Sequence, residues 1–143
     1  MQTNGQRPLM EAKNLKMYFN IKRKGKLHAV DNVSFEIYPG ETLGLVGESG
    51  CGKSTIGNVT MRLLKATGGE LLFEGEDVFQ AKGKESQAFR RKMQIIFQDP
   101  YSSLNPRKTV RKILREPYEV QHMGTSEQID QMVDKLCERV DIP

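Results

Sequence analysis

The chain has 143 residues, of which 37% are hydrophobic and 28% are charged, and its net charge is +4. This composition is typical of one soluble globular domain and excludes a disordered segment, while a mild positive charge interleaved with acids does not favour nucleic-acid binding. Uninterrupted apolar runs reach only three residues, whereas a membrane-spanning helix needs about twenty, so no segment is expected to cross a bilayer.

The N-terminal residues and the cysteines bear on the cellular compartment. Residues 1–14 contain no continuous apolar stretch behind a basic head and do not resemble a secretory signal. Cys51 and Cys137 lie far apart without a CxxC spacing, and they indicate neither a disulfide framework nor a zinc site. We therefore expect free thiols and a cytosolic chain.

The first part of the chain predicts a β-hairpin. An extended segment from Leu9 to Phe19 precedes the basic turn Lys22 to Lys26, and a second extended segment begins at Leu27. Near its end, apolar and polar residues alternate with a period of two, which places three apolar side chains on one face of a strand: Val33, Phe35 and Ile37. Pro39-Gly40 then turns the chain.

A short apolar strand, a glycine-rich loop and a helix come next. Thr42 to Val46 carries no charge, which is typical of a strand buried in the middle of a sheet. After the loop, apolar residues recur at helical spacing up to Gly68-Gly69, where a left-handed cap is expected to end the helix: Ile56, Val59, Leu63 and Leu64.

Shorter elements follow. Glu70 to Val78 predicts a hairpin around Glu74-Gly75, and Ser86 to Lys92 a short charged helix before a strand from Met93 to Phe97. Thr109 to Arg115 predicts a basic helical turn or two. Five cations in this segment and just before it fall on one helical face. A solvated surface is favoured for this face over contact with lipid phosphates or an acidic partner: Arg107, Lys108, Arg111, Lys112 and Arg115.

The last element is an amphipathic helix. Thr125 and Gln128 form a capping-box pattern at its start. Apolar residues then follow the i, i+3, i+4, i+7 series: Ile129, Met132, Val133, Leu136, Cys137 and Val140. Such a stripe requires a partner surface.

Residues 47–54, GESGCGKS, satisfy the pattern GxxxxGK[ST] between a predicted strand and a predicted helix. Glycines at positions 47, 50 and 52 let the backbone curl with its N–H groups directed at phosphate oxygens, and the following helix adds its positive end. Lys53 is expected to reach the β- and γ-phosphates, Ser54 to offer its hydroxyl to Mg²⁺, and Thr55 to contact the α-phosphate region. The loop alone indicates a nucleoside triphosphate and no particular reaction.

A second informative segment ends the strand predicted at residues 93–97. Gln98 stands where a Mg²⁺-binding aspartate would follow an apolar strand, and Asp99-Pro100 turns away. Gln98 is the better candidate than Asp99, because a neutral amide can touch Mg²⁺ or orient a water molecule and withdraw when the loop moves.

These residues resemble a known family. Gly47 to Thr55 (GESGCGKST) and Phe97 to Arg107 (FQDPYSSLNPR) are similar to the nucleotide-binding subunits of ABC transporters, and among them to the ATPases of oligopeptide and dipeptide importers. The similarity runs through nearly the whole chain.

The resemblance implies roles for individual residues. Phe19 matches the aromatic residue that stacks on the adenine ring, and Gln98 matches the Q-loop glutamine. Lys53 and Gln98 are then the catalytic candidates, and Ser54 and Gln98 the Mg²⁺ ligands. The nucleotide would be held by Phe19 and by the loop itself: Gly47, Glu48, Ser49, Gly50, Cys51, Gly52, Lys53, Ser54 and Thr55.

The fold implied is α/β, a P-loop NTPase core of the ABC type with an antiparallel β-subdomain and the beginning of a helical subdomain. Residues of about 1–100 would form the ATP-binding core and β-subdomain, and residues of about 101–143 the exit of the Q-loop and the start of the helical subdomain. No LSGGQ-type signature, Walker B aspartate with its glutamate, or switch histidine occurs in the 143 residues. We therefore expect the N-terminal part of a longer subunit, an incomplete domain.

Since the family hydrolyses ATP between two subunits, the resemblance implies ATP and Mg²⁺ as cofactors. Transmembrane permease subunits and a second ATPase subunit would be the partners, with no nucleic acid, at the inner face of the cell membrane. The isolated chain is expected to be inactive or nearly so. A module that binds ATP without hydrolysing it stays as an alternative, and a P-loop phosphotransferase is disfavoured because no lid arginine cluster is evident.

The segment from Gln98 to Arg107 is expected to couple nucleotide state to a membrane partner. Its prolines and serines predict an irregular loop. The loop starts at Gln98, which is expected to sense the γ-phosphate through Mg²⁺ or water. Tyr101 and Leu104 are the apolar residues that a partner would contact.

Overall fold

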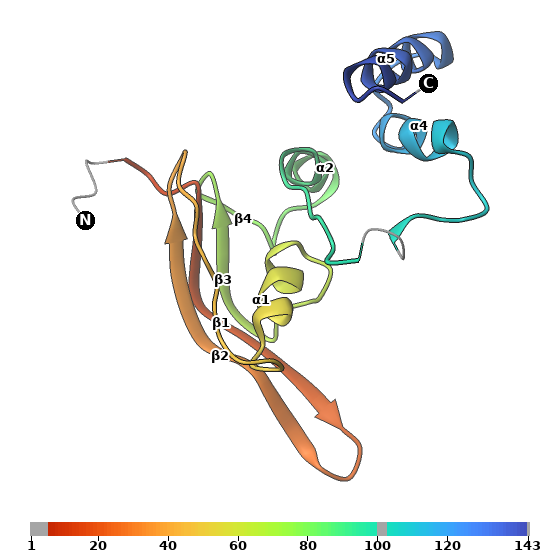
Figure 1. Ribbon diagram of the computed structural model, residues 1–143. Helices are drawn as coiled ribbons and strands as arrows, with labels where there is room; N and C mark the ends of the chain where they lie inside the picture. Colours follow the sequence, from red (N-terminus) through yellow and green to blue (C-terminus); the bar gives the residue numbers. More distant parts are fainter. Residues whose placement is uncertain (1–5, 100–102, 143) are drawn as a thin grey trace. The chain divides into compact units, whose positions relative to one another are not determined.

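The computed structural model describes residues 6–99 and 103–142, and the chain divides into two compact units, Met1–Gln94 and Ile95–Pro143. The described part of the first unit holds a sheet and two helices, and that of the second holds two further helices (Figure 1). Within the described residues, none of the helices combines the length and the apolar character that spanning a membrane requires.

The sheet of the first unit is antiparallel, with strand order β2-β1-β3-β4. Strands β1 (Met10–Ile21) and β2 (Gly25–Ile37) form the first predicted hairpin. Strands β3 (Gly68–Phe73) and β4 (Glu76–Asp77) form the second. Its turn residues Glu74 and Gly75 have φ of 53° and 82°. A turn with positive φ at both central residues fits the twist of two antiparallel strands. Both hairpin predictions are confirmed by the strand pairing.

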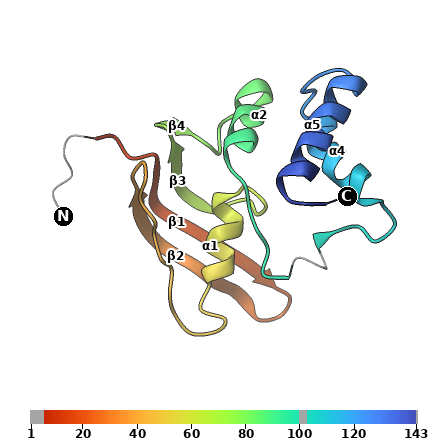
Figure 2. The same ribbon diagram turned by 45° about the horizontal axis from the view of Figure 1, so that its top comes forward.

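Helices α1 (Lys53–Thr60) and α2 (Gly83–Lys92) cover one face of this sheet (Figures 1 and 2). Under α1, Val59 packs with three sheet residues, Leu15, Met17 and Val30. Under α2, Phe89 packs with four others, Met10, Ala12, Leu71 and Phe73. The period of two predicted for β2 is confirmed, because Val33, Phe35 and Ile37 are half-buried against this core whereas Ser34 and Glu36 are exposed.

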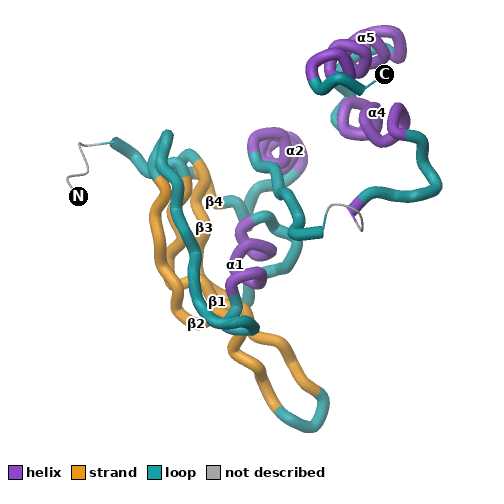
Figure 3. The backbone as a smooth tube through the Cα atoms, in the orientation of Figure 1, coloured by secondary structure: helices purple, strands orange, loops and turns teal. Residues whose placement is uncertain are grey.

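The strand predicted at Thr42–Val46 is not formed. This segment belongs to a loop that runs from β2 to α1 (Figure 3), and Val46 is 90% exposed. The strand predicted at Met93–Phe97 is likewise absent, with Ile96 95% exposed. An apolar run becomes a strand only where neighbouring strands take up its N–H and C=O groups. Within the described residues, the sheet's strands pair with one another and with neither segment.

Helix α1 ends earlier than predicted, at Thr60 instead of near Gly68-Gly69. The Thr60 hydroxyl donates to the carbonyl of Ile56 at 3.1 Å, a local bond that competes with the regular helix pattern. Two residues later Arg62 adopts a left-handed φ of 56°, and the N–H of Leu63 donates to the Asn58 carbonyl at 2.8 Å. These bonds turn the chain toward β3, which contains Gly68 and Gly69.

The second unit pairs helix α4 (Val110–Val120) with helix α5 (Ser126–Arg139). The capping box of Thr125 and Gln128 is confirmed, and Ile129 and Val133 are buried. Helix α4 runs beyond the predicted Thr109–Arg115 and includes a proline at position 117. The solvated face predicted for its cations is right in part: Arg107, Arg111 and Lys112 are exposed, whereas Arg115 is half-buried, and Arg111 and Arg115 also form ion pairs.

The guanidinium of Arg111 donates to Asp134 at 2.8 Å and to Asp130 at 3.2 Å, and that of Arg115 donates to Asp130 and Glu119. The carboxylates of Asp130 and Asp134 belong to α5, so these ion pairs tie the two helices together.

Candidate nucleotide-binding site

The loop before α1 requires glycine at two positions. Gly52 has φ of +101°, and a Cβ built on it would lie 2.3 Å from the carbonyl oxygen of Ala29 in β2. Gly47 has φ of +155°, and its Cβ would lie 2.9 Å from the Cys51 sulfur. The loop is therefore seated on the backbone of β2 at one end and closes on itself at the other, and a side chain at either position would disrupt this path.

The side chain of Lys53 lies inside this loop. Its ammonium donates to the carbonyl of Gly47 at 2.8 Å and to that of Glu48, and it lies 3.5 Å from the Cys51 sulfur. These contacts place a positive charge at the centre of the curled backbone. A phosphate oxygen is a stronger acceptor than a carbonyl and would replace one of them.

The start of α1 suits an anion. Gly52 is the N-cap and provides no side-chain acceptor, and the first turn carries no acidic residue. The first helical bond runs from Ile56 N–H to the Gly52 carbonyl at 2.9 Å, so the N–H groups of Lys53, Ser54 and Thr55 have no acceptor within the helix. Together with the helix dipole, these donors fit phosphate oxygens. The exposed Ser54 offers a hydroxyl oxygen in the same turn, the type of ligand that Mg²⁺ accepts.

Phe19 lies in β1, paired with Leu27 of β2. Its half-buried ring packs against the cluster of Leu15, Met17, Val30 and Val59, the cluster that also receives α1. The aromatic residue and the helix that begins with Lys53 therefore share one core.

Sequence reasoning missed a polar cluster beside Phe19. The Tyr18 ring stacks on His28 with centroids 4.0 Å apart, and its hydroxyl donates to Asp31 at 2.5 Å. This bond raises the pKa of Tyr18 and lowers the pKa of Asp31, since it is strongest with phenol protonated and carboxylate ionised. Tyr18 and His28 are paired across the β1–β2 hairpin, and this pairing would have predicted the cluster. The pairing depends on the strand register, which the sequence pattern does not give.

Gln98 and Asp99 belong to the second unit, where both are exposed. The Asp99 carbonyl accepts a bond from Ser103 at 2.8 Å, and Leu104 is 51% exposed. Tyr101 lies outside the described residues. The structure thus brings together the glycine loop, Lys53, Ser54, Thr55 and the core that holds Phe19, all in the first unit.

Three comparisons place these features among known proteins. The sequence model of a family described as ABC transporter matches residues 30–143. The oligopeptide transport ATP-binding protein OppF of Bacillus subtilis strain 168 is 52% identical over 134 residues, which cover 92% of this chain and 44% of OppF. The chain spans less than half the length of the curated relatives that it matches.

Among solved structures, a dimeric structure of MJ0796, a bacterial ABC transporter cassette, superposes with a TM-score of 0.69 at 26% identity, over 85% of this chain and 53% of that one. The dimeric post-hydrolysis state of the same cassette bound to ADP and Pi has a TM-score of 0.72 at 24% identity and covers 90% and 56% of the two chains. The fold is therefore that of part of an ABC-type P-loop cassette. Because the family match extends over most of the sequence, this chain belongs to the ABC transporter family of ATP-binding proteins.

Proposed function

We propose that the chain binds ATP through residues 47–55 and acts as the energy-coupling part of an ABC importer for peptides or related small solutes. The observation that carries this proposal is the Lys53 ammonium inside a glycine loop that leads into an uncapped helix N-terminus. The identity with OppF supports peptides as the class of transported solute.

In this proposal Lys53 binds the β- and γ-phosphates, Thr55 lies at the α-phosphate, and the Phe19 ring stacks on adenine. Ser54 and Gln98 would hold Mg²⁺, which when bound neutralises phosphate charge. Residues of about 1–100 would form the ATP-binding core and β-subdomain, and the remainder the start of a helical subdomain.

The partners would be transmembrane permease subunits and a second ATPase subunit, at the inner face of the cell membrane. The dimeric cassettes of the same fold support the second ATPase subunit. The loop would then supply half of a site that the partner subunit completes.

The substitution Lys53→Ala tests the phosphate site. We expect it to weaken binding of a fluorescent ATP analogue with Mg²⁺ by about ten- to a hundredfold, because a charge-assisted hydrogen bond contributes about 1.5–3 kcal/mol. Lys24→Ala, in the exposed hairpin turn, removes the same charge elsewhere and should leave the affinity unchanged. Equal affinities of wild type and Lys53→Ala would exclude the loop as the phosphate site.

The alternative, ATP binding without hydrolysis, is favoured for the 143-residue polypeptide itself, since its sequence contains no signature motif and no Walker B carboxylate pair. Positioning and charge stabilisation supply nearly all catalysis of phosphoryl transfer. We therefore expect no steady release of phosphate from ATP by the purified chain. Steady turnover that disappears in Lys53→Ala would contradict this and would make Asp99 a metal-ligand candidate.

A further inference from the structure

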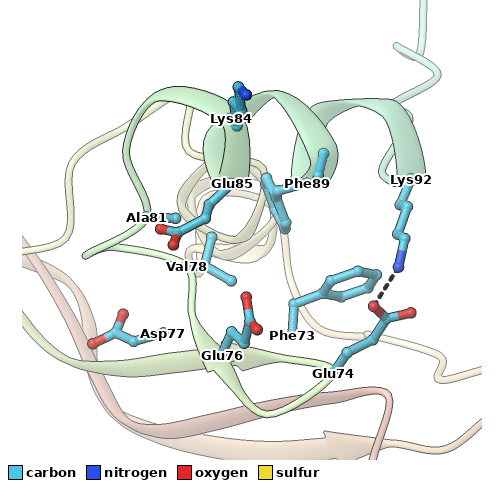
Figure 4. A pocket seen from close by; sticks show the side chains of 11 residues that line it. Phe73, Glu74, Glu76, Asp77, Val78, Ala81, Lys84, Glu85, Phe89 and Lys92 are labelled. Carbon is cyan, nitrogen blue, oxygen red and sulfur yellow. Dashed lines mark hydrogen bonds and ion pairs between the residues drawn. The ribbon is translucent and has the colours of Figure 1, made fainter.

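A groove of about 460 Å³ lies between the β3–β4 hairpin and α2 (Figure 4). Its floor consists of Phe73, Val78 and Phe89, which are 9%, 3% and 5% exposed. The two phenyl rings meet edge to face with centroids 5.6 Å apart. The floor is thus part of the close-packed core, and the groove is preformed.

The rim of this β4–α2 groove is acidic. Four carboxylates and two amines line it, an excess of negative charge on a chain whose net charge is +4: Glu74, Glu76, Asp77 and Glu85 against Lys84 and Lys92.

Two of the four carboxylates already have partners inside the protein. The ammonium of Lys92 donates to Glu74 and lies 5.9 Å from the centroid of the Phe73 ring. The Asp77 carboxylate accepts the N–H of Phe79 at 2.8 Å and so fixes the turn after β4.

Glu76 and Glu85 differ from these two. They are exposed on opposite walls, one on β4 and one in the first turn of α2, and both carboxylates point into the groove, whereas the Lys84 ammonium points away (Figure 4). Within the residues that the structure describes, neither carboxylate forms a hydrogen bond or ion pair through its side chain. The dipole of α2 favours an acid at position 85, and the guanidinium of Arg7 lies against Gly75, next to position 76, without an ion pair to Glu76.

We infer that the β4–α2 groove binds a cationic segment of a partner protein. A large apolar side chain of that segment would lie on the phenylalanine floor, and an adjacent arginine or lysine would lie between Glu76 and Glu85, where a guanidinium can form two parallel bonds to a carboxylate. The negative rim repels nucleotides, nucleic acids and anionic lipid headgroups, so the charge pattern selects a basic protein segment.

The test titrates the ¹⁵N-labelled chain with a short helical peptide that presents leucine and arginine on one face. A second peptide has glutamate in place of each arginine. We expect only the arginine peptide to bind, with amide shifts confined to residues 73–92. Glu85→Lys and Glu76→Lys should each weaken binding by about tenfold or more.

Two further variants complete the design. Ala88→Trp adds a ring at an exposed position of the groove wall and should block binding without a change of charge. Glu127→Lys makes the same charge change in the first turn of α5 and should have no effect. If one rim variant does not fold, the other and Ala88→Trp still decide the question.

Absence of peptide binding, equal binding of the glutamate peptide, or unchanged affinity in the rim variants would overturn the inference. So would amide shifts in residues 73–92 that appear on raising the protein concentration alone, since these would identify a second copy of the chain as the occupant. Nucleotide affinity, measured separately, tests the phosphate loop and not the groove.

Discussion

At the scale of single residues, the contact of Gly52 with the Ala29 carbonyl holds the glycine loop on the sheet. Gly52→Ala would place a methyl group 2.3 Å from that oxygen and force alanine to a φ of +101°. Unfavourable backbone regions alone cost on the order of 1–3 kcal/mol. We expect a clear loss of stability in urea unfolding followed by circular dichroism, together with weaker nucleotide binding.

Gly57→Ala is the matched control for this substitution. Position 57 is inside α1, and a Cβ there would meet nothing within 4 Å. Alanine should therefore stabilise the protein by about 0.5–1 kcal/mol. A Gly52→Ala variant with the unfolding midpoint of wild type would contradict the proposed seating of the loop.

At the scale of elements, ion pairs between α4 and α5 should make their association dependent on pH. The bonds from Arg115 and Arg111 hold the pKa of Asp130 below its ordinary value. A lowered folded-state pKa means that the stabilisation is complete above the ordinary pKa of about 3.9 and is lost as pH falls through the folded value. Asp130→Asn should therefore lower the thermal stability of the second unit at pH 7 and have little effect near pH 2.

Glu138→Gln, an exposed change in α5, is the control for Asp130→Asn. Helicity is followed by circular dichroism during thermal unfolding at several pH values. If the thermal stabilities of Asp130→Asn and wild type differ by the same amount at pH 7 and at pH 2, the ion pairs do not cause the pH dependence.

At the scale of the whole molecule, we expect residues 98–107 to report nucleotide state to a membrane partner. Leu104 is 51% exposed and available for contact. In a full-length subunit with Cys51 and Cys137 replaced by serine, a cysteine at position 101 or 104 should crosslink to cysteines in cytoplasmic loops of the permease. The yield should change when ATP is added, provided that the partner binds two states of the loop with different affinity.

A cysteine at position 24, in the hairpin turn, controls for random collision in the crosslinking experiment. If positions 101 and 104 give no crosslink under any nucleotide condition, the segment does not have the coupling role.

The sequence by itself determined the features that rest on short-range interactions. The two hairpins follow from turn residues and a period of two, and the capping box of α5 joins residues three positions apart. The glycine loop before α1 is equally local, because its glycines, Lys53 and the helix start are adjacent in the chain. In these cases the bonds that fix the backbone lie within the segment that the pattern describes.

Only the tertiary structure decided where distant segments meet. Thr42–Val46 and Met93–Phe97 have the composition of strands, yet no described strand pairs with them. Asp130, which Arg111 and Arg115 share, lies on another helix, and the carbonyl that Gly52 contacts belongs to β2. A strand needs hydrogen-bonding neighbours, and an ion pair needs an opposite charge. A close contact at a glycine needs a second backbone segment. In each case a remote part of the chain must supply the partner.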